Sequence, residues 1–467
     1  MFVEKIIPVV REAASLMLRS GFEVKEKGSS ANLVTSSDLA VQHYLVRHLG
    51  DFIPGSGFLC EEEDMDDISH EYIWIIDPID GTANYARSQQ DCCISVALAK
   101  DGEVCAGVVY SPWRDELYSA EKGSGAFCNG KPLKVSDRFF EEGIICTAMS
   151  TYRKEYARTC SDIIYDIYMR SNDFRRYGSA AIELCLLGAG FIELYFEMRL
   201  QPWDFAAASL VVKEAGGTLV GFGGKELCPF RQSMVIGANK RESCDDLVAT
   251  VNKYVAIDPL LEEYVEKEII PRYASFDKAH REDHVRSVIS SALELAGHYD
   301  VDKNMVYAAA AFHDTGLVDD RETHHLASGR IIREDRRLKE WFSPEQIETI
   351  ARAAEDHRAS GSEPRSIYGR IIAEADRDII PMKILRRTVQ FGMEHYPELD
   401  KEGHWNRFLD HLHEKYYYGG YLKLFIPESP NAAKLEDLRS VIGDLPKLRE
   451  IFEEIFKEEI YHKTNKS

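Results

Sequence analysis

Hydrophobic and polar positions follow two different patterns along the chain. Residues 1–250 mix short apolar runs, typical of strands, with helix-like stretches and frequent glycines, whereas residues 260–467 are almost entirely helix-like. With 467 residues, the chain is long enough for two or three domains of ordinary size. We therefore expect one domain over residues 1–255 and a second over residues 256–467.

An antiparallel sheet is the clearest element of the first part. Residues 94–110 (ISVALAKDGEVCAGVVY) place two apolar runs on either side of Asp101 and Gly102, which accept the positive φ angles of a tight turn. The following ELYSA run and the turn at Asn129 and Gly130 extend this hairpin into a meander. The first part is therefore predicted to be α/β with a largely antiparallel sheet.

Two regular elements of the first part have acidic residues at their ends. The apolar run IWIID predicts a buried strand, which we expect Pro78 and Gly81 to break. In QPWDFAAASLVVKEAGG, Asp204 is well placed to cap a helix from about residue 205 to residue 215. Acidic side chains are thus expected where a buried strand ends and where a helix begins.

Carboxylates crowd at three places in this part: Glu61 to Glu63, Asp77 with Asp80, and Asp204. Crowded carboxylates at the end of a buried strand repel one another and take up protons unless a cation neutralises them. Ligands that are all oxygens favour Mg²⁺. Each place alone is also compatible with an ordinary turn, helix cap or solvated loop, so the inference depends on all three occurring together.

A phosphate-binding backbone is expected next to these carboxylates. The N–H groups of Gly81 and Thr82 stand where a helix could begin, and such a helix start binds anions. Metal ions beside a bound phosphate are the components of metal-assisted phosphoester hydrolysis. The residues alone therefore indicate this type of chemistry.

Composition narrows the classes of partner. The chain has 78 acidic and 57 basic residues, a net charge of −21, which argues against nucleic-acid binding because that affinity depends on Lys and Arg. A small anionic substrate is compatible with this charge because bound metal ions reverse its local sign. No apolar run approaches the roughly 20 residues that span a bilayer, and the ten cysteines form no CxxC pair. We expect a cytoplasmic protein with free thiols and no membrane partner.

Two segments of the first part also resemble a known family. WIIDPIDGTANY resembles the first signature of the inositol monophosphatase family of phosphatases, and PWDFAAASLVVKEAGG resembles the second. GAFCNGKPLKVS and RRYGSAAIELC stand between them in the family's order. The resemblance covers about residues 3–250. It implies the layered αβαβα sandwich also found in fructose bisphosphatases, dependence on Mg²⁺, and a homodimer.

The resemblance implies a role for each matching residue. The implied ligands of up to three Mg²⁺ ions are the side chains of Glu61, Asp77, Asp80 and Asp204 and the carbonyl of Ile79. The implied catalytic set is Thr82, Asp38, Glu61 and Asp80, with Thr82 and Asp38 activating water, and the implied phosphate and substrate contacts are Gly81, Thr82, Ala180, Glu197 and Lys27. Cys60 replaces the usual Gly before the paired glutamates, so either Glu61 or Glu62 could be the ligand, and we favour Glu61. Glu193 also replaces a usual Asp.

The second part carries histidines and aspartates beside apolar helical stretches, in AHREDHVRSV, AAAFHDTGL, THHLASGR, AAEDHR and AEADRD. A single histidine of this kind is usually a hydrogen-bonded core residue. Several buried His and Asp side chains in one helix bundle need partners, and a shared metal ion supplies one. The second part is therefore predicted to be an all-α domain with a metal site.

This H…HD…D pattern resembles the HD-domain superfamily of metal-dependent phosphohydrolases, over about residues 265–400. The resemblance implies that His284, His313, Asp314 and Asp376 bind one divalent metal, for which Mn²⁺, Fe²⁺, Zn²⁺, Co²⁺ and Mg²⁺ are all suitable. Either His324 or His325, together with His357, would bind a second metal or contact phosphate.

Our main hypothesis is a bifunctional metal-dependent phosphohydrolase that acts on small phosphorylated substrates. The first site would hydrolyse inositol or sugar phosphates by in-line attack of metal-bound water, and the second would be an HD-type phosphohydrolase. The alternatives are a 3′(2′),5′-bisphosphate nucleotidase, a fructose-1,6-bisphosphatase, or a regulatory protein that binds transcription complexes. Arg175, Arg176 and Arg199 are candidates for holding a second phosphate.

Overall fold

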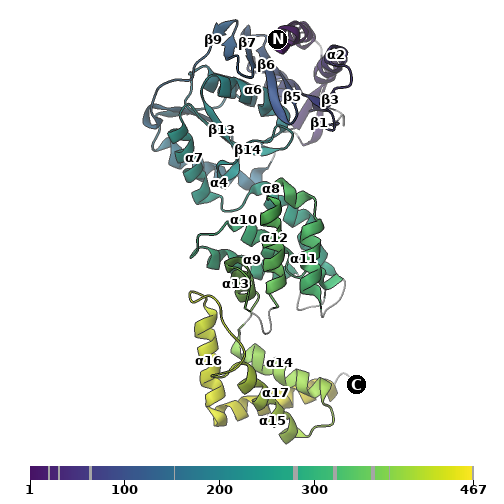
Figure 1. Ribbon diagram of the computed structural model, residues 1–467, viewed down its shortest axis with the longest axis vertical. Helices are drawn as coiled ribbons and strands as arrows, with labels where there is room; N and C mark the ends of the chain where they lie inside the picture. The colour runs from purple at the N-terminus through teal and green to yellow at the C-terminus, as the bar shows by residue number, and fades with distance from the viewer. Residues whose placement is uncertain are drawn as a thin grey trace. The chain divides into compact units, whose positions relative to one another are not determined.

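The computed structural model divides the chain into two compact units, Met1–Val255 and Ala256–Ser467 (Figure 1). The first unit is α/β and the second is all-helical, which confirms the predicted fold classes. The structure describes residues 1–18, 22–29, 32–62, 66–151, 153–276, 282–318, 323–358, 363–377 and 379–464.

A seven-stranded sheet dominates the described part of the first unit. Its strands, in spatial order, are β3 (Gly57–Cys60), β4 (Tyr72–Asp80), β5 (Cys93–Lys100), β6 (Glu103–Ser111), β7 (Glu116–Glu121), β8 (Ala126–Cys128) and β9 (Lys131–Pro132). Only the β3–β4 pair is parallel, so the predicted antiparallel meander is confirmed. Asp101 and Gly102 form the predicted tight turn with φ angles of 51° and 89°.

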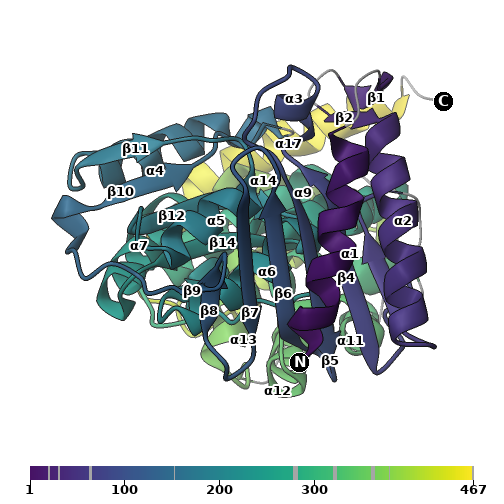
Figure 2. The same ribbon diagram turned by 90° about the horizontal axis from the view of Figure 1, so that it is seen from above.

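Helices cover both faces of this sheet. On one face, α1 (Phe2–Met17) and α2 (Ser36–Phe52) lie side by side, as Figure 2 shows. On the other face lie α5 (Ala180–Gly188) and α6 (Pro202–Glu214). A hairpin of β1 (Val24–Ser29) and β2 (Asn32–Thr35) precedes α2.

A second sheet completes the layers of the first unit. Its order is β11 (Asp173–Arg175), β10 (Ile144–Thr147), β12 (Leu194–Leu200), β14 (Ser233–Ala238) and β13 (Thr218–Val220). Tyr195 and Val235 face α5 and α6, whereas Leu194 and Ile236 face the outer helices α4 (Ala157–Tyr168) and α7 (Arg241–Tyr254). This alternation gives the helix–sheet–helix–sheet–helix order of the predicted sandwich.

Two elements begin or end differently from the sequence prediction. Pro78 does not break β4: the strand continues to Asp80, with a shift in register against β5 between Asp77 and Asp80. Proline fits there because the irregular pairing needs no ladder N–H. Helix α6 begins at Pro202 because proline favours a first helical position, so Asp204 lies in the first turn and is not the cap residue.

The second unit contains two apolar clusters. The first is formed mainly by α8 (Pro259–Tyr264), α9 (Glu282–Ala296), α10 (Lys303–Phe312), α11 (His324–Glu334), α12 (Pro344–Asp356) and α13 (Ile367–Ala375). The second is formed by α14 (Pro381–His395), α15 (Lys401–Lys415), α16 (Asn431–Gly443) and α17 (Leu445–Thr464). Among the residues placed by the structure, no helix is both long and apolar enough to cross a membrane.

Buried Glu374 connects α13 of the first cluster to the chain leading into the second. Its side chain accepts hydrogen bonds from the backbone N–H of Phe425, at 3.0 Å, and from Asn431 Nδ2, at 3.1 Å. The end of α13 and the start of α16 are therefore held side by side.

Close contact between β6 and α6 leads to a stability prediction. A Cβ at Gly107 would lie 2.6 Å from the carbonyl oxygen of Ala207, so the Gly107→Ala variant must separate the two elements. We expect a loss of about 1–3 kcal/mol in the free energy of unfolding. For a unit of this size, each kcal/mol lowers the melting temperature by about 2–4 °C, measured by calorimetry.

The matched control is Gly50→Ala in α2. A Cβ there would come no closer than 3.5 Å to the ring of Phe58, and alanine favours a helix by up to about 1 kcal/mol over glycine. This variant should melt at or above the wild-type temperature. Equal melting temperatures for the two variants would contradict the proposed close contact.

Candidate active sites

Three carboxylates predicted from the sequence converge in the first unit. Asp77 and Asp80 lie at the end of β4, and Asp204 lies in the first turn of α6. One oxygen of each lies within 4.8 Å of the others. The irregular pairing between β4 and β5 and the early start of α6 are the local features that bring them together.

The electrostatics of this carboxylate cluster suit a cation. Burial and the neighbouring carboxylates raise the pKa of Asp77 and of Asp204 well above the usual range. Burial also raises the pKa of Asp80, although hydrogen bonds from Ser179 Oγ (2.6 Å) and the Ala181 N–H (2.7 Å) oppose this shift. Several oxygens that repel one another in a buried site fit a hard divalent cation such as Mg²⁺.

The two candidate glutamates lie in different surroundings. Glu61 interacts with Asp77 and raises the pKa of both Asp77 and Asp204. Glu62 is buried and raises the pKa of Asp38 instead. The structure therefore brings Glu61 to the carboxylate cluster.

The turn after β4 requires glycine and places Thr82 beside the carboxylates. Gly81 has a φ angle of 90°, and a Cβ there would lie 2.8 Å from the carbonyl oxygen of Asp91. The short helix α3 (Thr82–Tyr85) follows, and Thr82 Oγ1 donates to the carbonyl oxygen of Ile79 at 3.0 Å. The Ile79 carbonyl and the Thr82 hydroxyl thus lie together next to Asp80.

Asp38 is a buried carboxylate with an unused acceptor. Both the N–H and the hydroxyl of Thr35 donate to its Oδ2. Its Oδ1 is buried and has no hydrogen-bond partner among the described residues. Burial raises the pKa of Asp38 to about 6, against the effect of Thr35. An unpaired oxygen with a pKa near neutrality is suited to accept a proton.

The structure describes two of the three remaining predicted substrate contacts. Asp80 also receives a hydrogen bond from the backbone of Ala180. Glu197 on β12 is within hydrogen-bonding distance of the Tyr195 hydroxyl (2.8 Å), and burial raises its pKa to about 7. The side chain of Lys27 lies outside the described residues.

Two supporting residues were missed by sequence analysis. Ser179, 99 positions from Asp80, donates directly to that carboxylate. Buried Glu183 accepts hydrogen bonds from the N–H groups of Tyr177 and Gly178, at 2.6 and 2.9 Å, and so fixes the segment before Ser179. No spacing rule predicts contacts across such a separation.

Glu193, which replaces a usual Asp, and two of the three candidate arginines have identifiable contacts. Glu193 accepts from Ser136 Oγ, Arg138 Nη1 and the Ile144 N–H, at 2.8–2.9 Å, and so anchors the second sheet. Arg175 pairs with Asp173. The positive charge of Arg176 lowers the pKa of Glu197, so Arg176 lies close enough to interact with this predicted substrate contact.

The second unit brings its predicted histidines and aspartates into one cluster centred on Asp314. Its Oδ2 lies 3.6 Å from His284 Nε2 and 3.3 Å from His313 Nε2. Its Oδ1 lies 3.1 Å from His324 Nε2 and 3.4 Å from His357 Nε2. Two groups that could each hold a metal ion therefore share one carboxylate.

Asp376 completes the first of these groups. Its Oδ1 lies 3.1 Å from His284 Nε2 and 3.6 Å from His313 Nε2. Of the two neighbouring histidines, His324 is the one whose Nε2 lies close to Asp314 Oδ1 and His357 Nε2, at 3.1 Å from each.

Hydrogen bonds orient two of the imidazoles. His313 Nδ1 lies 2.7 Å from the carbonyl oxygen of Ala310, and His357 Nδ1 lies 2.5 Å from that of Ala354. A neutral ring that donates through Nδ1 turns the lone pair of Nε2 toward the cluster, as metal binding requires. Asp314 raises the pKa of His313, although burial lowers it. His313 in turn lowers the pKa of Asp314, although burial raises it. The cluster therefore favours a positive charge at its centre.

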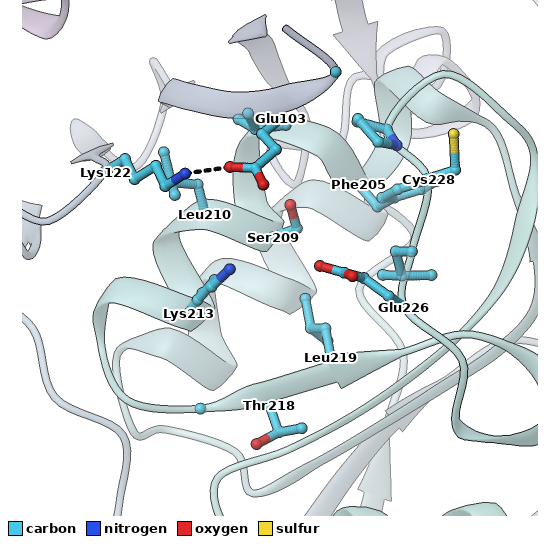
Figure 3. A pocket seen from close by; sticks show the side chains of 15 residues that line it. Glu103, Lys122, Phe205, Ser209, Leu210, Lys213, Thr218, Leu219, Glu226 and Cys228 are labelled. Atoms are coloured by element: carbon cyan, nitrogen blue, oxygen red, sulfur yellow. Dashed lines mark hydrogen bonds and ion pairs between the residues drawn. The ribbon is translucent and has the colours of Figure 1, made fainter. Parts of the chain in front are cut away.

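A separate cavity of about 580 Å³ in the first unit contains none of the predicted site residues. Phe205, Ser209 and Lys213 of α6 line it, and Lys122 and Glu103 form an ion pair beside it (Figure 3). This cavity is therefore separate from the carboxylate cluster.

Comparison with known proteins agrees with this geometry. The sequence model of the inositol monophosphatase family matches residues 2–256, and that of the HD domain matches residues 281–378. The chain belongs to the inositol monophosphatase family. It is therefore a phosphoric monoester hydrolase of this family, and the HD domain supplies a second hydrolase site.

Curated relatives of the first unit carry two kinds of name. Nus factor SuhB of Escherichia coli is 34% identical over 225 residues, which cover 47% of this chain and 84% of the relative. Fructose-1,6-bisphosphatase/inositol-1-monophosphatase of Thermotoga maritima is 34% identical over 232 residues, which cover 50% and 87%.

A solved structure shares the fold of the first unit. The inositol monophosphatase of Thermotoga maritima has a TM-score of 0.50 and 33% identity, and the match covers 54% of this chain and 97% of that one.

The shifted pKa of Asp77 predicts a pH dependence. A raised pKa means that, without metal, the folded state binds more protons than the unfolded state above about pH 4. Stability contributed by this group is therefore lost as pH rises. In the presence of a chelator, Asp77→Asn should melt at a higher temperature than the wild type, by a larger margin at pH 8 than at pH 5.5, measured by calorimetry.

Exposed Asp137 provides the control, because Asp137→Asn removes a charge that does not face the carboxylate cluster. Added Mg²⁺ should stabilise the wild type and this control, but not Asp77→Asn. A margin for Asp77→Asn that does not change with pH would show that these carboxylates do not repel one another as described.

The shared position of Asp314 predicts metal content. We expect Asp314→Asn to lose both metal ions of the cluster, and His324→Ala or His357→Ala to lose one. His325→Ala is the matched control and should keep both, because His325 belongs to neither of the two groups that could hold a metal ion among the described residues. Metal retained per chain after desalting, measured by elemental analysis, tests this. Equal losses for His324→Ala and His325→Ala would refute the assignment.

Proposed function

We propose that the first unit hydrolyses phosphate monoesters of inositol or sugars with Mg²⁺, and that the second unit is a separate phosphohydrolase with two metal ions. The observation that supports the first proposal most strongly is the convergence of Asp77, Asp80 and Asp204 beside Thr82. We assign Glu61, the Ile79 carbonyl and these three aspartates as the ligands of up to three Mg²⁺ ions.

We assign a separate role in the first site to each of these residues. Mg²⁺ bound there neutralises the phosphate charge and lowers the pKa of water. The N–H groups of Gly81 and Thr82 hold the phosphate at the start of α3. The hydroxyl of Thr82 orients the attacking water, and the unpaired Oδ1 of Asp38 takes up a proton. Attack in line with the leaving oxygen needs no covalent intermediate.

The charged groups near the first site and the name of a relative support the substrate proposal. We place Ala180, Glu197 and Lys27 around the substrate, with Arg176 near Glu197. A relative named for both fructose 1,6-bisphosphate and inositol 1-phosphate hydrolysis supports a broad sugar-phosphate specificity. A 3′(2′),5′-bisphosphate nucleotidase is the alternative. A homodimer and a cytoplasmic location stay predictions of the family resemblance.

The second site is assigned from the shared carboxylate. Asp314 would be a ligand in both groups, with His284, His313 and Asp376 for one ion and with His324 and His357 for the other. Mixed nitrogen and oxygen ligands suit Mn²⁺, Fe²⁺, Zn²⁺ or Co²⁺ as well as Mg²⁺. Two ions held in these groups would stabilise the attacking and leaving oxygens of a phosphoester, which supports a phosphohydrolase.

A regulatory role is the alternative of another class, because several relatives are named Nus factor SuhB. The cluster of carboxylates gives this alternative no additional support. It predicts a protein that releases no phosphate from any monoester. Phosphate release from inositol 1-phosphate, fructose 1,6-bisphosphate and adenosine 3′,5′-bisphosphate with Mg²⁺ separates the three hypotheses.

Substitutions test the residues of the first site. We expect Asp80→Asn and Asp204→Asn each to lower kcat/KM by at least about 100-fold, since even changes next to metal ligands cost 10–100-fold. Glu61→Gln should behave similarly, whereas Glu62→Gln should lower kcat/KM much less, because Glu62 acts on the pKa of Asp38 and not on those of Asp77 and Asp204. Circular dichroism should show that all variants remain folded.

His313→Ala tests whether the two sites act separately. It should leave hydrolysis by the first unit unchanged and remove metal from the second. Wild-type rates for both Asp80→Asn and Asp204→Asn would show that the carboxylate cluster is not the active site.

A further inference from the structure

An open pocket in the second unit connects the Asp314 cluster to helices beyond the HD domain. Its volume is about 430 Å³. His284 and Asp376 of the cluster line it, together with Ser287 and Ser291 of α9. The rest of the lining comes from the start of α14 and from the segment leading into α16. Because the HD-domain match ends at residue 378, these parts lie outside the domain.

The added helices bring positive charge to this pocket. Lys383 and Arg387 lie one turn apart on α14, and Lys434 lies in the first turn of α16. All three are exposed. Arg387 and Lys434 make no ion pair or hydrogen bond with any residue that the structure describes.

The neighbouring Arg386 differs from Arg387 and Lys434, because it has an acidic partner. It forms an ion pair with Glu458 at 2.7 Å, on the side of α14 that faces α17. The chain has 78 acidic and 57 basic residues, so acidic partners are abundant. Cations that line a pocket without pairing remain able to bind an anion from solution.

Among the described residues, the acidic side chains of the pocket form no ion pair with Arg387 or Lys434. Glu374 is buried and engaged by Arg377, at 3.2 Å, and by Asn431. Asp283 and Glu294 lie 11 positions apart on α9, which separates them by about 16 Å along the helix. Between them the wall offers the hydroxyl groups of Ser287 and Ser291.

We propose that α14 and α16 complete the HD active site, with Lys383, Arg387 and Lys434 holding a phosphate group that is not the one hydrolysed. The substrate is then a small molecule with at least two phosphate groups. One phosphate binds at the Asp314 cluster and another binds the three cations, with the serines of α9 between them. The pocket volume suits a small metabolite. This inference rests on the proposed HD hydrolase.

Non-hydrolysable probes test the proposal directly. Linear alkyl bisphosphonates of increasing length are compared with alkyl monophosphonates of equal length, by calorimetric titration of the metal-loaded full chain. The wild type should bind the best bisphosphonate at least about tenfold more tightly than its monophosphonate, because the second group adds charge-assisted hydrogen bonds. Comparison between variants cancels any binding at the first unit, which they all share.

The deciding variant is the double substitution Arg387→Ala with Lys434→Ala. It should lose most of the bisphosphonate preference, while monophosphonate affinity and metal content stay close to the wild type. Lys423→Ala is the matched control: it removes an exposed lysine outside the pocket and should keep the preference.

Two failures can be told apart on the same preparations. A wild type that retains no metal at the Asp314 cluster would refute the proposed HD hydrolase. Normal metal retention, with no bisphosphonate preference at any length or with the full preference in the double variant, would refute the anion site alone.

Discussion

Repulsion among buried carboxylates is the constraint on which the first unit depends. Asp77, Asp80 and Asp204 cannot all stay charged in a buried site without a cation, because burial and mutual repulsion both favour protonation. The fold nevertheless holds them together through the end of β4, the first turn of α6 and the hydrogen bonds to Asp80. The apolar layers on both sides of α5 and α6 offset this unfavourable arrangement.

The second unit reduces the repulsion among buried ligands by using histidines as well as aspartates. Imidazoles are neutral when they bind a metal, so several can be buried together at a lower electrostatic cost than carboxylates. Asp314 supplies the negative charge and turns one oxygen toward each half of the cluster. The oxygen-only set of the first unit and the mixed nitrogen and oxygen set of the second therefore differ in the range of metal ions that they suit.

Local patterns predicted most of the regular elements, because a turn such as Asp101 with Gly102 carries its own signal. The details of the sites depend on contacts between distant segments. The continuation of β4 through Pro78 depends on β5 beside it, and Ser179 reaches Asp80 across 99 positions. Adjacent residues such as His324 and His325 point in directions about 100° apart on a helix, so the sequence cannot choose between them without knowing the inward face.

The position of each candidate ligand on its helix decides whether the helix dipole favours or opposes the charge of its side chain. Asp204 lies at a helix N-terminus, where the helix dipole favours its negative charge. Asp376 lies at the C-cap of α13, where the dipole opposes it. His284 and His313 compensate, since they lower the pKa of Asp376 despite its burial. His313 itself occupies the C-cap of α10, where a positive charge is favoured. Without metal, protonated histidines can balance the aspartates of the Asp314 cluster, whereas the carboxylates of the first unit are neutralised only by protons or by a cation from solution.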